Sequence, residues 1–112
     1  MNLEITDLSP GSGPPAQPGD ALSIHYRGTL DNGAEFDSSY PRGETLDFTL
    51  GAAELIKGMD DGLVGLKVGG KRRLRTPPQL GYGPSGIPGV IPPNAVLVFE
   101  VELVRIRPPL TA

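Results

Sequence analysis

Two long segments of the chain alternate apolar and polar side chains, and this pattern constrains the fold more than any other feature of the sequence. The first, residues 21–30, carries four apolar side chains on one face: Leu22, Ile24, Tyr26 and Leu30. The second, residues 95–106, alternates glutamates with another four: Leu97, Phe99, Val101 and Leu103. Because successive side chains of a β-strand point to opposite faces, both segments are predicted to be strands with one buried face.

Four shorter segments also have the character of strands: residues 3–8, 34–38, 46–50 and 71–76. Asp31-Asn32-Gly33 follows the first long strand, and this sequence is typical of a hairpin turn because its residues tolerate positive φ. The following segment is therefore predicted to return as the partner strand.

One short helix is predicted within residues 52–66, where apolar side chains recur at helical spacing at Ile56, Met59 and Leu63. Gly58 and Gly62 weaken a helix, so their presence favours close packing of this helix on the sheet. Strands, one helix and further strands indicate the α+β class, with an antiparallel sheet and the helix on one face. No internal repeat or linker is visible, and residues 1–112 are expected to form a single domain.

Glycine and proline are abundant, with 16 and 13 residues respectively, a level at which disorder has to be considered. The alternating apolar runs argue instead for a turn-rich folded domain. Residues 77–94 are the richest in both, yet apolar side chains are spread through them: Leu80, Tyr82, Ile87, Val90 and Ile91. Long loops in compact domains are usually functional or disordered, and this composition favours a loop that lines a site over a solvated linker.

Charge and composition exclude several classes of partner. The net charge is −3 and the pI is near 5.0, which argues against binding to nucleic acid or anionic lipid. The basic residues of 71–75 would be divided between two faces of a strand, as expected for a solvated surface. There is no cysteine and no long apolar run, so a cytoplasmic protein without a membrane segment is expected.

Residues for covalent or metal chemistry are also scarce. The only histidine, His25, lies on the outward face of its strand, so a Ser-His-Asp triad is poorly supported. Asp60 and Asp61 are adjacent on the helix and point in different directions, which disfavours a metal site. We expect no metal and no cofactor. The remaining possibility is an apolar site suited to binding or to a reaction without proton transfer.

Several motifs occur in a characteristic order and spacing: His25-Tyr26-Arg27-Gly28, Phe36-Asp37-Ser38-Ser39, residues 51–58, Tyr82-Gly83-Pro84-Ser85-Gly86, and residues 91–95 leading into 97–103. Together they closely resemble the FKBP-type peptidyl-prolyl isomerases, over residues 3–106. The resemblance implies an α+β fold in which a twisted antiparallel sheet of five or six strands wraps around one short α-helix. It also implies a binding cleft between the helix and the sheet.

The resemblance further implies which residues act. The group expected to be catalytic is Tyr26, Phe36, Asp37, Tyr82 and Phe99. The group expected to bind substrate is Arg42, Leu46, Glu54, Leu55, Ile56, Met59, Ile87, Val90 and Ile91. In similar proteins the main-chain N–H at Ile56 and the hydroxyl of Tyr82 donate to ligand carbonyls, and the residue at Arg42 supports Asp37. Met59 is expected at the floor of the pocket.

Other roles remain open for these residues when they are considered singly. Tyr26 and Phe99 fit a place in the core equally well, and Asp37-Ser38-Ser39 also fits a simple turn. Glu54 also fits a carboxylate at the start of a helix, where the helix dipole favours negative charge. Only the joint pattern favours a functional site.

Three positions depart from the family pattern. Met59 stands where most members carry tryptophan, Leu46 where they carry phenylalanine, and Leu80 where many carry tyrosine. A thioether is more deformable than an indole and offers a proline ring a less rigid surface. We therefore expect weaker binding of macrolide drugs than in the best members.

The function implied by the resemblance is prolyl cis/trans isomerisation, assisting protein folding as a monomer. Its partners would be proline-containing peptides and folding proteins, together with macrolides of the rapamycin type. One alternative is a non-catalytic module that uses the same pocket to bind proline-containing partners or macrolides. Nucleic-acid binding through the basic strand is a more distant alternative.

Overall fold

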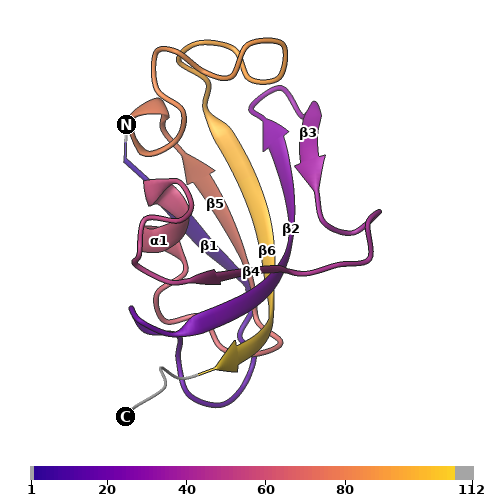
Figure 1. Ribbon diagram of the computed structural model, residues 1–112, viewed down its shortest axis with the longest axis vertical. Helices are drawn as coiled ribbons and strands as arrows, with labels where there is room; N and C mark the ends of the chain where they lie inside the picture. Colours follow the sequence, from indigo (N-terminus) through magenta and orange to yellow (C-terminus); the bar gives the residue numbers. More distant parts are fainter. Residues whose placement is uncertain (1, 108–112) are drawn as a thin grey trace.

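The protein consists of one antiparallel sheet with a short helix against it (Figure 1). A computed structural model describes residues 2–107. The six strands of the sheet are β1 (Glu4–Ser9), β2 (Ala21–Leu30), β3 (Glu35–Ser38), β4 (Leu46–Thr49), β5 (Lys71–Thr76) and β6 (Leu97–Arg107). Helix α1 spans Lys57–Gly62 and a short 3-10 helix, η1, spans Pro78–Leu80. This arrangement confirms the predicted α+β class.

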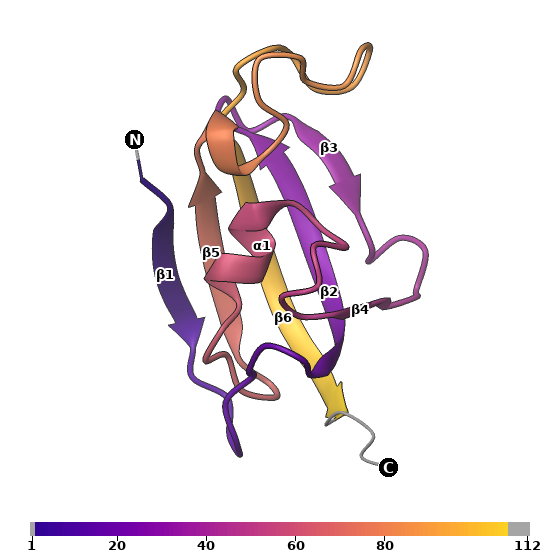
Figure 2. The same cartoon turned by 60° about the vertical axis from the view of Figure 1, so that its left-hand side comes forward.

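The two predicted long strands, β2 and β6, are neighbours at the centre of the sheet. The strand order is β1-β5-β6-β2-β3, and β4 also pairs with β2. The β2–β6 pairing runs from Ala21 opposite Arg107 to Leu30 opposite Leu97, with one register shift between Ser23 and Ile24. The predicted alternation of β6 is also confirmed, because every second residue from Leu97 to Leu103 is buried. These buried side chains belong to the core. Helix α1 lies against this face of the sheet (Figure 2).

The predicted short helix is confirmed, and it occupies only the middle of the segment in which it was predicted. Its apolar spacing suggested a helix within residues 52–66, whereas α1 covers only the six residues Lys57–Gly62. Ile56 has an extended backbone, with φ −58° and ψ 152°, and Ala53 has a positive φ of 59°. The helical pattern at Ile56, Met59 and Leu63 arises because one turn and its two flanking residues face the core together.

Close packing explains the two glycines of α1, as the sequence predicted. A Cβ atom at Gly58 would lie 2.6 Å from Cγ2 of Thr76, and one at Gly62 would lie 2.7 Å from Cδ2 of Leu74. Both neighbours belong to β5 and are completely buried. The glycines therefore let α1 approach the sheet more closely than any other residue would allow.

The basic residues of β5 form ion pairs within the protein. Arg72 pairs with Asp7 at 2.6 Å and also donates to the carbonyls of Gly62, at the end of α1, and Val64, just beyond it. Arg73 pairs with Glu100. A third arginine, Arg75, pairs with two carboxylates, Glu4 and Asp31. This cluster joins β1, β5 and the end of α1. The side chains of Arg73 and Arg75 are 47% and 39% exposed, as expected for a solvated surface, whereas the side chain of Arg72 is only 13% exposed.

Two kinds of feature are missing from the part of the chain that the structure describes. None of its helices has the length and apolar character needed to cross a membrane. Within residues 2–107, no three histidine, aspartate or glutamate side chains are grouped so that they could hold a metal ion.

Replacing Gly62 with alanine tests the close packing of α1. In an exposed helix this change would raise the free energy of unfolding by up to about 1 kcal/mol. Here the added methyl group would instead meet the buried Leu74 side chain. We expect Gly62→Ala to lower the free energy of unfolding by about 1–2 kcal/mol, because overpacking a core is costly. The measurement is denaturant-induced unfolding. Asp61→Ala on the exposed side of α1 is the control and should change stability by less than about 0.5 kcal/mol; equal effects of the two variants would contradict close packing.

Candidate functional site

A cavity of about 500 Å³ lies between α1 and the sheet. This volume is within the range of small-molecule and cofactor sites. The residues that line it are Tyr26, Phe36, Asp37, Leu46, Ala53, Glu54, Leu55, Ile56, Met59, Tyr82 and Phe99. Most are apolar or aromatic, with a small number of polar groups among them.

The walls come from elements that are distant in sequence. Tyr26 lies on β2, Phe36 on β3, Leu46 at the start of β4 and Phe99 on β6. Met59 of α1 is 3% exposed and closes the cavity from the helix side. The cavity therefore exists only when four strands and the helix are assembled.

Two phenylalanines pack edge to face in the wall. The ring centroids of Phe36 and Phe99 are 5.7 Å apart, and the rings are inclined at 85°, an arrangement that aromatic quadrupoles favour. Gly28 makes this pair possible, because a Cβ there would lie 2.7 Å from Cζ of Phe36 and 3.0 Å from Cε1 of Phe99. The sequence pattern contained Gly28 in a motif but assigned it no role.

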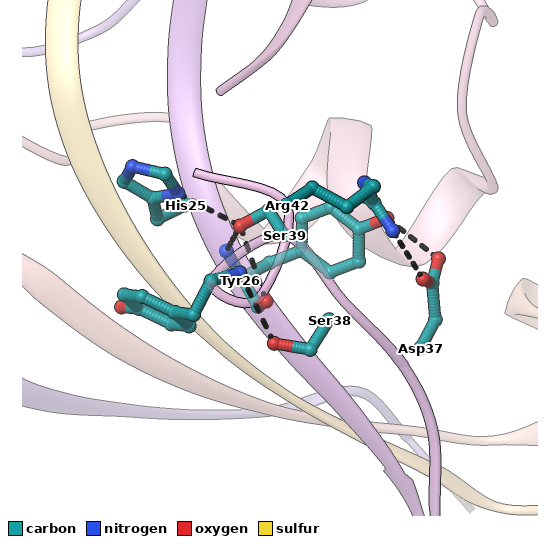
Figure 3. Close-up of polar contacts among 7 residues, drawn as sticks. His25, Tyr26, Asp37, Ser38, Ser39 and Arg42 are labelled. Carbon is teal, nitrogen blue, oxygen red and sulfur yellow. Dashed lines mark hydrogen bonds and ion pairs between the residues drawn. The ribbon is translucent and has the colours of Figure 1, made fainter. Parts of the chain in front are cut away.

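A hydrogen-bonded group of three side chains forms the polar part of the wall (Figure 3). The Tyr26 hydroxyl donates to Oδ2 of Asp37 at 2.6 Å. Arg42 donates from Nη1 to Oδ1 of Asp37 at 3.2 Å and from Nη2 to the Tyr26 hydroxyl at 3.3 Å. Arg42 does not line the cavity itself, but it contacts the two residues that do.

These contacts fix the protonation states of the group. Burial by itself would raise the pKa of Asp37, but the hydrogen bonds from Tyr26 and Arg42 outweigh burial and lower it below its usual value. Burial raises the pKa of Tyr26, and the hydrogen bond to Asp37 adds to the effect. At neutral pH, Asp37 is therefore a carboxylate and Tyr26 a neutral phenol that donates to it.

The segment before α1 forms one edge of the cavity and is held by carboxylates. Asp60 accepts the main-chain N–H groups of Gly51 and Ala53 at 2.9 and 3.0 Å, and Glu54 accepts the N–H of Thr49. The N–H of Ile56, which follows this segment, donates to no main-chain carbonyl among residues 2–107. Ile56 belongs to the lining of the cavity and directly precedes α1.

The long Gly/Pro loop contributes only one residue to the cavity. Tyr82 follows η1 and is 39% exposed at the cavity. Beyond it the loop folds back on itself, with two main-chain hydrogen bonds between Ile87 and Ile91. Val90 and Ile91 line a separate hollow with Leu30.

The structure thus divides the residues that the sequence singled out. All five of the expected catalytic group line the cavity, together with Leu46, Glu54, Leu55, Ile56 and Met59. Ile87, Val90 and Ile91 do not line it, because hydrogen bonds within the loop hold them elsewhere. The sequence did not single out Ala53, and its positive φ of 59° carries no signal in an alanine.

Comparisons with known proteins agree with one another. The family model described as FKBP-type peptidyl-prolyl cis-trans isomerase matches residues 13–104. An "FK506-binding protein" of Neisseria meningitidis serogroup A is 50% identical over 94% of this chain and 96% of its own length. "FK506-binding protein 1" of Saccharomyces cerevisiae is 48% identical, over 95% of this chain and 94% of its own.

Two solved structures share the fold. FkpA from Escherichia coli superposes with a TM-score of 0.86 at 44% identity, covering 95% of this chain and 48% of its own. AtFKBP13 superposes with a TM-score of 0.85 at 42% identity, covering 94% of this chain and 93% of its own. Since family model, relatives and fold agree over nearly the whole chain, this protein belongs to the FKBP-type peptidyl-prolyl cis-trans isomerase family.

Proposed function

We propose that the cavity binds an X-Pro segment of a peptide or folding protein and accelerates rotation about its imide bond. The single observation that carries this proposal is a cavity of about 500 Å³ with three aromatic walls and an ionised, hydrogen-bonded carboxylate beside them. Its apolar walls match a proline ring, and the few polar groups are suited to orienting the peptide main chain.

The reaction does not require a side chain to act as an acid or a base. Rotation about a peptide bond meets a barrier of about 18–20 kcal/mol because amide resonance is lost, and no covalent bond breaks. The twisted amide has a less polar carbonyl than the planar one, so its transfer from water into an apolar cavity costs less free energy. An apolar site that binds the twisted form more tightly accelerates rotation, at about 1.4 kcal/mol for each factor of ten.

The proposed roles follow from the position of each residue around the cavity. The proline ring sits against Tyr26, Phe36 and Phe99, with Met59 beneath it. The main-chain N–H of Ile56 and the hydroxyl of Tyr82 donate to carbonyls of the bound peptide. Both residues belong to the lining, and the N–H of Ile56 donates to no main-chain carbonyl among the described residues.

Asp37 is proposed to make the polar contact near the rotating amide. Its carboxylate is ionised at neutral pH, and Tyr26 and Arg42 fix both of its oxygens. A fixed carboxylate needs no reorganisation when the amide twists, which is the advantage of a preorganised polar group. Arg42 supports this geometry without lining the cavity.

A second candidate function is supported by the floor of the cavity. Met59 is flexible, so the same cavity is suited to retaining a proline-containing partner or a macrolide with little turnover. Relatives carry the name "FK506-binding protein", which makes FK506 the natural probe of this site. Isomerisation of a proline peptide by the wild-type protein distinguishes the two functions, because a binding module would retain FK506 without catalysis.

Removing single groups from the cavity tests the catalytic proposal. We expect Phe36→Ala to lower kcat/KM for a proline tetrapeptide by at least about tenfold, because it removes an aromatic wall and one partner of the edge-to-face pair. Tyr82→Phe should lower it by about two- to fivefold through the loss of one hydrogen bond. A protease-coupled or NMR exchange assay measures both, and Val104→Ala on the exposed part of β6 is the control. Wild-type activity in both site variants would place the reaction elsewhere.

Changing the floor tests the role of Met59. We expect Met59→Trp to tighten FK506 binding by about tenfold, since an indole offers a larger and more rigid surface than a thioether. Calorimetry measures the affinity of wild type and variant, and the introduced indole is also a fluorescent reporter because the chain contains no other tryptophan. Met59→Leu is the control and should change affinity little. Unchanged affinity in Met59→Trp would show that residue 59 does not form the floor for the ligand.

A further inference from the structure

The edge of β2 that faces away from β6 has a gap beside the cavity. β6 pairs with β2 along its whole length. The other edge is shared, because β4 pairs with Ala21–Ile24 and β3 pairs with Arg27–Thr29. His25 and Tyr26 lie between these two ladders, so neither strand pairs with them on that side. Tyr26 therefore needs another partner for its main chain.

Ser39 fills this gap with its main chain and its side chain (Figure 3). The N–H of Ser39 donates to the carbonyl of Tyr26 at 3.0 Å, and the N–H of Tyr26 donates to Oγ of Ser39 at 2.8 Å. Ser39 is completely buried. Its hydroxyl thus takes the place of a carbonyl that a continuous strand would supply.

The same short segment holds Tyr26 at both ends. Asp37, two residues before Ser39, accepts the Tyr26 hydroxyl, while Ser39 accepts the Tyr26 main-chain N–H. Tyr26 and Asp37 both line the cavity, whereas Ser39 does not. A change at the Ser39 hydroxyl therefore reaches the cavity through Tyr26.

His25 contacts this hydroxyl from the opposite face of the sheet. Its Nδ1 lies 2.9 Å from Oγ of Ser39. The hydroxyl has one proton to donate, and the alternative acceptor, the carbonyl of Tyr26, is 3.4 Å away and already accepts the N–H of Ser39. For the neutral imidazole, geometry therefore favours the tautomer that accepts this proton at Nδ1 and carries its own proton at Nε2.

Protonation of His25 reverses this bond. Nδ1–H would then donate to Oγ of Ser39, so the same oxygen would accept from His25 and from Tyr26. The hydroxyl proton would have to turn to the more distant carbonyl of Tyr26. The charged Nδ1–H then competes with the Tyr26 N–H for Oγ of Ser39, which weakens the hold on the Tyr26 main chain. The hydroxyl's new contact with the Tyr26 carbonyl is too long, at 3.4 Å, to compensate.

The surroundings of His25 contain several charged groups. Its ring stacks on Tyr40 with centroids 5.0 Å apart, and the Tyr40 hydroxyl donates to Glu102, the residue opposite His25 on β6. The titratable and charged residues that share this face of the neighbouring strands are Arg27, Glu35, Asp47, Lys71, Arg73, Arg75, Glu100, Glu102, Arg105 and Arg107.

We propose that Ser39 is a positioning residue that holds Tyr26 and Asp37 in the geometry the cavity uses, and that protonation of His25 loosens this hold. For its activity readout the inference rests on the proposed isomerase function. Histidine is the side chain that ordinarily changes charge between pH 8 and pH 5, and His25 is the only one in the chain. Asp37 stays ionised over this range because its hydrogen bonds lower its pKa.

The test measures kcat/KM for a neutral proline peptide from pH 8 to pH 5 in four proteins. In wild type, kcat/KM should fall about two- to fivefold as His25 gains its proton, because this is the effect expected from weakening one hydrogen bond. Ser39→Ala should be about fivefold less active at pH 8 and show no such step. His25→Asn keeps an acceptor near the position of Nδ1 without titrating, so it should retain the pH 8 activity and lose the step.

Ser38→Ala is the matched control. Ser38 is also buried, and its hydroxyl accepts only the N–H of Tyr40 among the described hydrogen bonds. This variant should keep both the wild-type activity and the wild-type step. Thermal unfolding of all four proteins separates losses of stability from losses of activity.

Two results would overturn the proposal. The first is a Ser39→Ala variant with wild-type kcat/KM and only a lower unfolding midpoint, which would make Ser39 merely structural. The second is a pH step that persists in His25→Asn. An NMR titration of the Tyr26 amide gives an answer without catalysis: its resonance should follow the His25 titration in wild type and become independent of pH in His25→Asn.

The two proposals fail in distinguishable ways. If wild type isomerises no peptide but the Tyr26 amide follows His25, the isomerase function is wrong and the link from His25 to Tyr26 stands. If the peptide is isomerised but neither kcat/KM nor the Tyr26 amide responds to His25, the link is wrong and the isomerase function stands. Should Ser39→Ala fail to fold, the His25→Asn titration still decides.

Discussion

The antiparallel pairing of β2 with β6 is the contact on which the rest of the molecule depends. These two strands pair over their full length and carry much of the buried core. Every other strand is attached to one of them: β3 and β4 to β2, and β5, with β1 beyond it, to β6. The pair also supplies Tyr26 and Phe99, so the register that builds the core also sets the spacing of the cavity walls.

The sequence predicted the sheet well because the alternation of a strand is local. Leu22, Ile24 and Tyr26 reveal their shared face by spacing alone, and they are buried as expected. The ends of α1 are different, because Ile56 and Leu63 face the core from non-helical or terminal positions. Apolar spacing cannot distinguish a residue inside a helix from a flanking residue that points the same way.

The motifs predicted most of the residues that line the cavity, but not all of them. Gly28 and Ala53 illustrate where that information ends, since one acts through the space it leaves and the other through an unusual backbone angle. The loop at residues 77–94 was expected to line the cavity, but only Tyr82 does so. The pairing of Ile87 with Ile91 is a contact within the loop, and nothing in its composition distinguishes that from contact with a ligand.

The position of the walls along the chain has a consequence for synthesis. Tyr26 and Phe36 leave the ribosome before Phe99, which lies on the last of the six described strands. A nascent chain that lacks β6 has no partner for the long inner edge of β2, and its cavity has no second phenylalanine. The cavity is therefore completed only when β6 inserts between β2 and β5.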